Sequence, residues 1–173
     1  PLSLHLSTNR ATPDNEFANH EIRRPAFICN NDHWVRLSLA DMIFNGVFER
    51  YPKLYVGSVE HELSWVPYFV MRLDWLHSLT PVERGGHKFN NDMLPSEVFR
   101  QNIFVDLQED GVGIEMRHKI GVDNILWGSD YPHPDCIWPD SQEIIERDLA
   151  NLKDERVKRK ILRDNAAKLY GFN

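Results

Sequence analysis

The chain has 173 residues, of which 42% are hydrophobic and 27% are charged, a composition typical of a globular domain with a sizeable core. Its formal net charge of -6 argues against a nucleic-acid partner, because that binding depends on clustered lysine and arginine. No stretch approaches the roughly 20 apolar residues of a membrane span and we see no signal peptide, so we expect a soluble, cytoplasmic protein without a membrane partner.

The first predicted element is a strand at residues 2–6, where leucines alternate with polar residues. The chain starts inside this strand and without methionine, so we expect upstream residues to be missing. Residues 9–32 are polar and contain two prolines, and we interpret them as a long loop that contributes to an active-site cover. A helix is predicted over residues 38–49, with Ser38 as its N-cap.

The second predicted strand covers residues 54–60. Apolar residues then recur at helical spacing over residues 65–79, which predicts a helix. A polar loop is expected at residues 81–95. A short helical segment near residues 96–100 leads to the third predicted strand, at residues 103–107.

A helix is predicted at residues 112–120, before a fourth strand that ends at Asp130. Asp140 opens a segment with the spacing of a capping box, which predicts the start of another helix. The last predicted helix runs from about residue 154 to residue 170 and stops at Gly171, a residue type that often ends helices.

Strands and helices thus alternate as four βα units, which indicates a parallel sheet covered by helices. Four units form either a small open sheet or half of an eight-stranded barrel, and periodicity does not choose between them. The incomplete first strand favours the half barrel. We therefore expect residues 1–173 to be a single domain that lacks the N-terminal half of its barrel.

Three of the predicted strands finish with side chains that bind metals or move protons. They are His5, then Glu60 with His61, then Asp130 with His133, while the third strand offers Asp106, Glu109 and Asp110. The carboxyl ends of parallel strands are where such folds carry out chemistry. Imidazole and carboxylate together suit zinc or another divalent first-row ion, which lowers the pKa of bound water to about 7.

Each of these residues also has a purely structural interpretation. His5 is compatible with a satisfied core histidine, and Glu60 belongs to a segment compatible with a solvated turn. Asp130 is a residue type that starts turns, with His133 then at the surface. A functional site is favoured because independent strands place such groups at the same end.

Three segments resemble the carboxyl-terminal end of amidohydrolase-related proteins. They are residues 128–133 (GSDYPH), 138–141 (WPDS) and 165–172 (NAAKLYGF). The resemblance is to the amidohydrolase-2 family, which includes aminocarboxymuconate-semialdehyde and resorcylate decarboxylases. Residues 46–54, 64–67 and 94–103 are similar to further segments of the family, so the resemblance covers nearly the whole chain.

The resemblance implies a TIM-type (β/α)8 barrel with one divalent metal ion, often zinc, at the carboxyl ends of its strands. The chain would supply strands five to eight. His5 would be the metal histidine of the fifth strand, and Asp130 the eighth-strand aspartate that binds metal and takes a proton from water. The sixth-strand position, often a histidine that polarises substrate, falls at or beside Glu60, and His61 follows it.

The family's first-strand His-x-His pair has no counterpart in this sequence. His5 and Asp130 are two protein ligands, fewer than the three usual for catalytic zinc. This polypeptide is therefore expected to bind metal weakly and to be inactive by itself. A longer gene product or a second chain is expected to cover the open barrel, and we expect a homo-oligomer.

The first functional hypothesis is a metal-dependent hydrolase of the amidohydrolase type, with Asp130 as base and Glu60 or His61 orienting a small-molecule substrate. Zinc is the expected ion, with manganese or cobalt as alternatives. Non-oxidative decarboxylation on the same scaffold is a close second hypothesis. A hypothesis of another class is an inactive barrel fragment that serves as a binding or assembly module.

Overall fold

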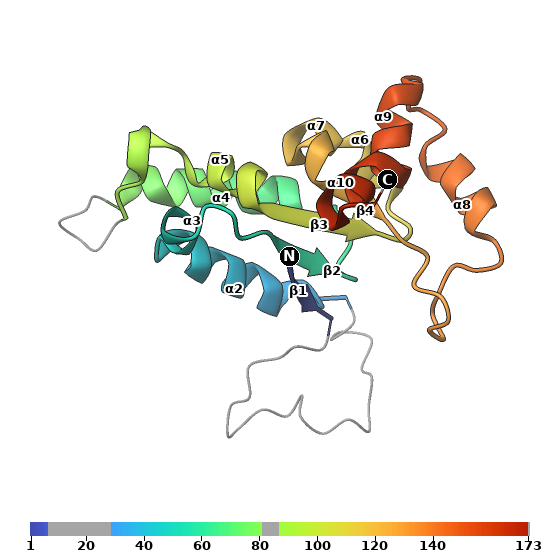
Figure 1. The fold of residues 1–173 in the computed structure, drawn as a ribbon, viewed down its shortest axis with the longest axis horizontal. Helices are drawn as coiled ribbons and strands as arrows, with labels where there is room; N and C mark the ends of the chain where they lie inside the picture. Colours follow the sequence, from blue (N-terminus) through green and yellow to red (C-terminus); the bar gives the residue numbers. More distant parts are fainter. Residues whose placement is uncertain (7–28, 81–86, 173) are drawn as a thin grey trace.

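The computed structural model describes residues 1–6, 29–80 and 87–172, which form an α/β structure around a parallel sheet (Figure 1). The sheet consists of β1 (Leu2–His5), β2 (Val56–Val59), β3 (Ile103–Leu107) and β4 (Ile125–Trp127). Each strand pairs in parallel with the next one along the chain, so the spatial order is β1-β2-β3-β4. The predicted parallel sheet of βα units is confirmed.

The strand order bears on the two architectures that the sequence left open. A doubly wound open sheet reverses its strand order at a switch point. A βα barrel instead adds each strand beside the preceding one. The sheet follows the second pattern, which is that of an arc of a barrel. Because the four strands are parallel, their carboxyl ends lie along one edge of the sheet.

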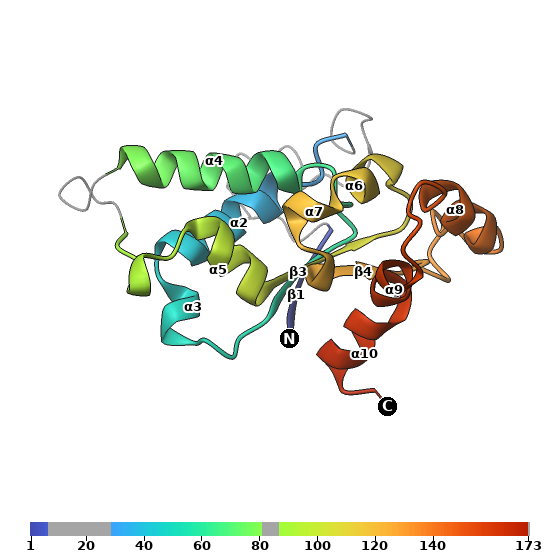
Figure 2. The same ribbon diagram turned by 90° about the horizontal axis from the view of Figure 1, so that it is seen from above.

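Helices lie in each connection between strands. The connections contain α2 (His33–Phe44) and α3 (Val47–Arg50), then α4 (Val66–Leu79), the 3-10 turn η3 (Asn90–Asp92) and α5 (Pro95–Asn102), then α6 (Gly111–Glu115), α7 (Arg117–Ile120) and the turn η4 (Val122–Asn124). After β4 come α8 (Ser141–Asp148), α9 (Glu155–Arg159), the π-helical turn η5 (Lys160–Asp164) and α10 (Asn165–Tyr170). Figure 2 shows α3 and α8 at opposite ends of the molecule. Within the described residues, none of these helices has both the length and the apolar character needed to cross a bilayer.

The helix predicted at residues 38–49 differs from the structure at both ends. α2 begins at His33, so Ser38 lies inside the helix and its prediction as the N-cap is wrong. α2 ends at Phe44, and Gly46 then adopts a left-handed backbone with φ of 65°. This conformation interrupts the helix and is one that glycine adopts readily, so α3 follows as a separate turn.

Two later helices also differ from their predictions in detail. The helix predicted at residues 112–120 is divided at Met116 into α6 and α7. The helix start predicted at Asp140 is confirmed, since Asp140 is the N-cap of α8, but the capping box is not formed, because the Asp140 side chain makes no hydrogen bond to the first turn. The last predicted helix is present as α9, η5 and α10 in succession, and it ends at Gly171 with φ of 74°.

Part of the predicted loops lies outside the described residues. This holds for residues 9–28 of the loop expected at 9–32 and for residues 81–86 of the loop expected at 81–95. The interpretation of the first loop as a cover of the site stays a prediction.

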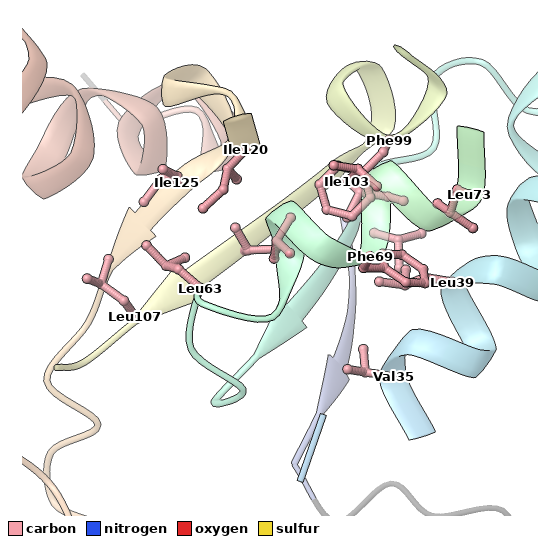
Figure 3. Close-up of a cluster of buried hydrophobic side chains, with 14 of the residues drawn as sticks. Val35, Leu39, Leu63, Phe69, Leu73, Phe99, Ile103, Leu107, Ile120 and Ile125 are labelled. Carbon is pink, nitrogen blue, oxygen red and sulfur yellow. The ribbon is translucent and has the colours of Figure 1, made fainter. Parts of the chain in front are cut away.

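The main core lies between one face of the sheet and the helices (Figure 3). Ile103, Leu107 and Ile125 contribute to it from β3 and β4, and Leu39 and Phe69 contribute from α2 and α4. All five side chains are at most 8% exposed. Burial of this apolar area is the main force that holds the helices on the sheet.

The opposite face of the sheet, which we call the inner face, carries the alternate residues of each strand. His5 belongs to it, since the preceding residue Leu4 packs against the core. Phe104 and Asp106 are on the inner face of β3. A β-carbon at Gly57 would lie 2.2 Å from the Phe104 ring, so this part of β2 requires glycine.

Three buried or partly buried asparagine side chains join neighbouring βα units at the amino ends of the strands. Each donates two hydrogen bonds through Nδ2 to backbone carbonyls that precede or begin a strand. The pairs are Asn102 to Pro52 and Leu54 (3.1 and 2.9 Å), Asn124 to Arg100 and Ile103 (2.7 Å each), and Asn165 to Val122 and Ile125 (2.7 and 2.8 Å). The amino edge of the sheet is thus tied by neutral hydrogen bonds.

Candidate metal centre

The candidate site lies at the opposite, carboxyl edge of the sheet and begins at β1. His5 ends this strand on the inner face, and its Nδ1 is 2.9 Å from the carbonyl oxygen of Leu6. A carbonyl only accepts hydrogen bonds, so Nδ1 carries the proton and Nε2 points toward the next strand's end. This hydrogen bond to Leu6 raises the pKa of His5, and the charge of Glu60 raises it further.

Glu60 follows β2 directly and joins two of the predicted site residues. Its Oε1 is 2.6 Å from Nε2 of His5, and its carboxyl group also forms a side-chain hydrogen bond with Asp130. Burial raises the pKa of Glu60, and the contact with Asp130 adds to the rise. The backbone of Glu60 is left-handed, with φ of 63°, which is strained for a residue with a side chain.

His61 lies away from these contacts. It is 5% exposed, and its Nδ1 is 3.1 Å from the hydroxyl oxygen of Ser58, which is itself buried. Burial lowers the pKa of His61 to about 4, so this imidazole is neutral near pH 7. Of the two residues that the sequence offered at the end of β2, the structure brings Glu60 to the cluster and buries His61 against Ser58.

Asp130 completes the cluster from the segment after β4. Its backbone is also left-handed, with φ of 58°. Besides meeting Glu60, its Oδ2 is 3.1 Å from Nδ1 of His133, which also contacts Asp135. The ligand atoms of Asp130, His133 and Asp135 lie within 4.8 Å of one another, although His133 and Asp135 are exposed.

Asp106, at the end of β3, is a residue of this region that sequence reasoning did not select. Its Oδ1 accepts a hydrogen bond from the backbone N–H of Glu60 at 2.9 Å. Burial raises its pKa to about 6. The sequence showed Asp106 beside Glu109 and Asp110, but it gave no signal that separates the three.

Two further carboxylates link the loops that follow β2 and β3. Asp110 accepts hydrogen bonds from the backbone N–H groups of Leu63, Ser64 and Gly113 at 2.7 to 2.8 Å. Glu62 accepts longer ones from the backbone of residues 108 and 109, at 3.2 to 3.4 Å. Burial raises the pKa of Glu62 to about 7. The loop after β2, which carries Glu60, is therefore hydrogen-bonded to the loop after β3 through one carboxylate from each loop.

The donors at this edge fit a divalent cation. His5 presents an imidazole nitrogen, and Glu60 and Asp130 present carboxyl groups that touch each other. Two touching carboxylates repel unless a proton or a cation lies between them, and imidazole with carboxylate is a donor set that first-row divalent ions prefer. Which of these residues bind metal stays a prediction.

Comparison with known proteins agrees with the architecture. Residues 107–172 match a family model described as "Amidohydrolase". A solved amidohydrolase from Mycobacterium avium subsp. paratuberculosis K-10 is 34% identical to this chain, with a TM-score of 0.64, over 83% of this chain and 35% of that one. Residues 107–172 therefore match the family that the motifs in this part of the chain resemble.

More distant solved structures share the fold. The 2,6-dihydroxybenzoate decarboxylase from Rhizobium is 18% identical with a TM-score of 0.68, over 98% of this chain and 51% of that one. A dihydroxybenzoic acid decarboxylase from Polaromonas sp. JS666, solved with manganese and an inhibitor, is 21% identical with a TM-score of 0.61, over 82% and 41%. The chain thus spans 35% to 51% of the length of these three structures. No curated protein matches the chain.

Proposed function

We propose that the protein is a metal-dependent hydrolase of the amidohydrolase type, acting on a small organic molecule at the carboxyl edge of the sheet. One observation carries this proposal. The carboxyl group of Glu60 contacts both His5 and Asp130, so polar groups that follow three different strands meet at one place. Independent strands have no structural need to place titratable groups together.

The roles of the residues follow from their contacts. His5, through Nε2, and Asp130 would hold the ion, which when bound supplies Lewis acidity that lowers the pKa of water and polarises a substrate oxygen. The Asp130 carboxylate would accept the proton of the attacking water. We assign the orientation of substrate to Glu60 rather than to His61, because His61 is buried against Ser58.

We further propose that residues 1–173 correspond to strands five to eight of an eight-stranded barrel. The sequential order of the parallel strands supports this assignment, as does a chain that spans 35% to 51% of its solved relatives. The remaining strands would add further ligands and close the interior. On this proposal the chain by itself binds metal weakly and has little activity.

For the ion, manganese is the first choice to test, since a structure of the same fold was solved with it. Zinc and cobalt, which accept the same donors, are the alternatives.

We also propose a cytoplasmic homo-oligomer, and sedimentation of the purified protein tests the assembly: a monomer at micromolar concentration would refute it.

Asp130→Ala tests the proposed function directly. We expect the full-length protein to lose one manganese-binding event, or to bind at least about tenfold more weakly, because a ligand oxygen is removed. Asp123→Ala is the matched control, since Asp123 is an exposed acid near the amino end of β4 that pairs with Lys160. Isothermal titration measures both. Equal affinity in wild type and Asp130→Ala would remove Asp130 from the metal site.

Non-oxidative decarboxylation is the second candidate, and the likeness of the fold to two dihydroxybenzoate decarboxylases favours it. Incubating manganese-loaded full-length protein with 2,6-dihydroxybenzoate and with aryl esters separates the two reactions. Release of carbon dioxide without ester cleavage would replace the hydrolase proposal. Absence of metal binding by the full-length protein would favour the non-enzymatic binding or assembly module.

A further inference from the structure

The backbone of Glu60 is held in an unusual conformation by a neighbouring strand. With φ of 63°, Glu60 is in the left-handed region, which costs a residue with a side chain about 1–3 kcal/mol and persists only where the surroundings impose it. The residues that follow are held by the hydrogen bonds of Glu62 and Asp110 described above. Two hydrogen bonds act on the backbone of Glu60 itself, and in one of them Nδ2 of Asn31 donates to the Glu60 carbonyl at 3.3 Å.

The shorter of these two hydrogen bonds is made with Asp106. Its Oδ1 accepts the Glu60 backbone N–H at 2.9 Å, across a separation of 46 residues in sequence. β2 and β3 are paired immediately before this point, with Ser58 opposite Val105, so the position of Asp106 relative to Glu60 is set by the sheet. The bond occupies a donor that would otherwise be unsatisfied past the strand end.

The direction of the Glu60 side chain depends on this backbone. In a regular strand, residue 60 would share a face with Val56 and Ser58, which face the helices. The left-handed turn instead brings the carboxyl group to Nε2 of His5, at 2.6 Å, and to Asp130. Without the turn, Glu60 would leave the cluster.

We propose that Asp106 is a positioning residue, which holds Glu60 in the left-handed turn and so keeps its carboxyl group between His5 and Asp130. This inference rests on the proposed function for its catalytic meaning. The geometric role of Asp106 does not depend on the proposed function, and the experiments below test it without measuring enzyme activity.

Two substitutions of Asp106 separate geometry from charge. Asp106→Asn and Asp106→Leu both remove the negative charge and keep a side chain branched at Cγ, but only asparagine retains an oxygen that accepts the Glu60 N–H. Any difference between these two variants therefore reports on the hydrogen bond. Glu60→Ala provides the reference in which the carboxyl group is missing.

The first measurement uses the metal-free full-length protein. The imidazole nitrogen NMR signals of His5 report its contact with Glu60. We expect Asp106→Asn to keep the wild-type pattern at a fixed pH, whereas Asp106→Leu moves it to that of Glu60→Ala. Loss of the pattern in Asp106→Asn overturns the proposal, even if the leucine variant does not fold, and so does an unchanged pattern in folded Asp106→Leu.

The second measurement is the affinity for manganese alone. Glu60 contacts both proposed metal ligands, His5 and Asp130, so its displacement leaves them less well oriented. We therefore expect Asp106→Leu to bind manganese about tenfold more weakly than Asp106→Asn, the usual size of an effect on a residue that orients a metal site. In a Glu60→Ala background this difference should vanish, because Asp106 then has no carboxyl group to position. A difference that persists there means that Asp106 acts through another group and overturns the proposal. Failure of the wild type to bind manganese instead removes the proposed function and leaves the NMR test decisive.

Discussion

Among single residues, Glu62 is expected to make stability depend on pH. Burial raises its pKa to about 7 in the folded protein, above the ordinary value of 4.5. The folded state therefore binds this proton more tightly than the unfolded state. The stability that the protonated Glu62 contributes is fully present below pH 4.5 and is lost as the pH rises through 7.

Glu62→Gln removes this ionisation and keeps an oxygen for the backbone hydrogen bonds. We expect the variant to gain about 1–3 kcal/mol of unfolding free energy relative to wild type on going from pH 5 to pH 8. Urea unfolding with chelator at both pH values measures this gain. Glu109→Gln, which alters an exposed carboxyl group, should show no such change, and a Glu62→Gln difference that is the same at both pH values would contradict the assignment.

Glu60 and His61 show where sequence reasoning about the site stopped. Side-chain alternation along β2 would send residue 60 toward the helices with Val56 and would give residue 61 the inner face. The left-handed turn at Glu60 reverses that order. The hydrogen bond from Glu60 to Asp106 that accompanies this turn joins residues 46 positions apart, so no local pattern reveals it. His5 and Asp130, by contrast, were recognisable because His5 ends one predicted strand and Asp130 ends another.

At the scale of elements, the asparagine ties explain part of a family motif. Asn165 opens the NAAKLYGF segment, and its side chain reaches the carbonyls of Val122 and Ile125, at the start of β4. Asn165 is 8% exposed, so water has little access to take over its hydrogen bonds. This residue serves to dock α10 on the sheet, and it lies at the edge opposite the candidate site.

Asn165→Ala should therefore destabilise the protein without changing metal affinity. It removes two hydrogen bonds and leaves two buried carbonyls without this donor, for which we expect a loss of about 2–3 kcal/mol of unfolding free energy. Asn151→Ala is the matched control at an exposed position. Urea denaturation gives the loss, and manganese titration of the folded variant gives the affinity. A stability loss equal to that of Asn151→Ala would show that the tie contributes little.

The elements themselves were predictable to different degrees. The strand β1 was found because its leucines alternate with polar residues, β4 because it is a short apolar run, and α4 because its apolar residues recur at helical spacing over four turns. Helix ends were less predictable. Ser38 has the character of an N-cap yet lies within α2, because packing of Val35 and Leu39 in the core extends the helix toward His33. The helix predicted at residues 112–120 is interrupted at Met116, a position without the glycine or proline that would have indicated a break.

For the whole molecule, the outer strands of the sheet lead to a prediction about closure. β1 and β4 are the edge strands of the described sheet. If the remaining strands of a barrel pair with them in the longer protein, backbone amides of β1 and β4 should exchange with deuterium at least about tenfold more slowly there than in the 173-residue chain. β2 and β3, which are paired on both sides, serve as internal controls. Equal exchange of the edge strands in both proteins would argue against closure by further strands.

Because Asp106 and Glu60 come from neighbouring strands, the cluster forms only when β2 and β3 pair in the native register. Side chains alternate along a strand, so a slip of one position between the two would replace Asp106 by Val105 or Leu107 opposite the turn. Neither side chain can accept an N–H, and the acid would swing away from His5. A misaligned sheet would thus be unable to assemble the cluster, and only molecules that have folded with the native alignment would acquire it.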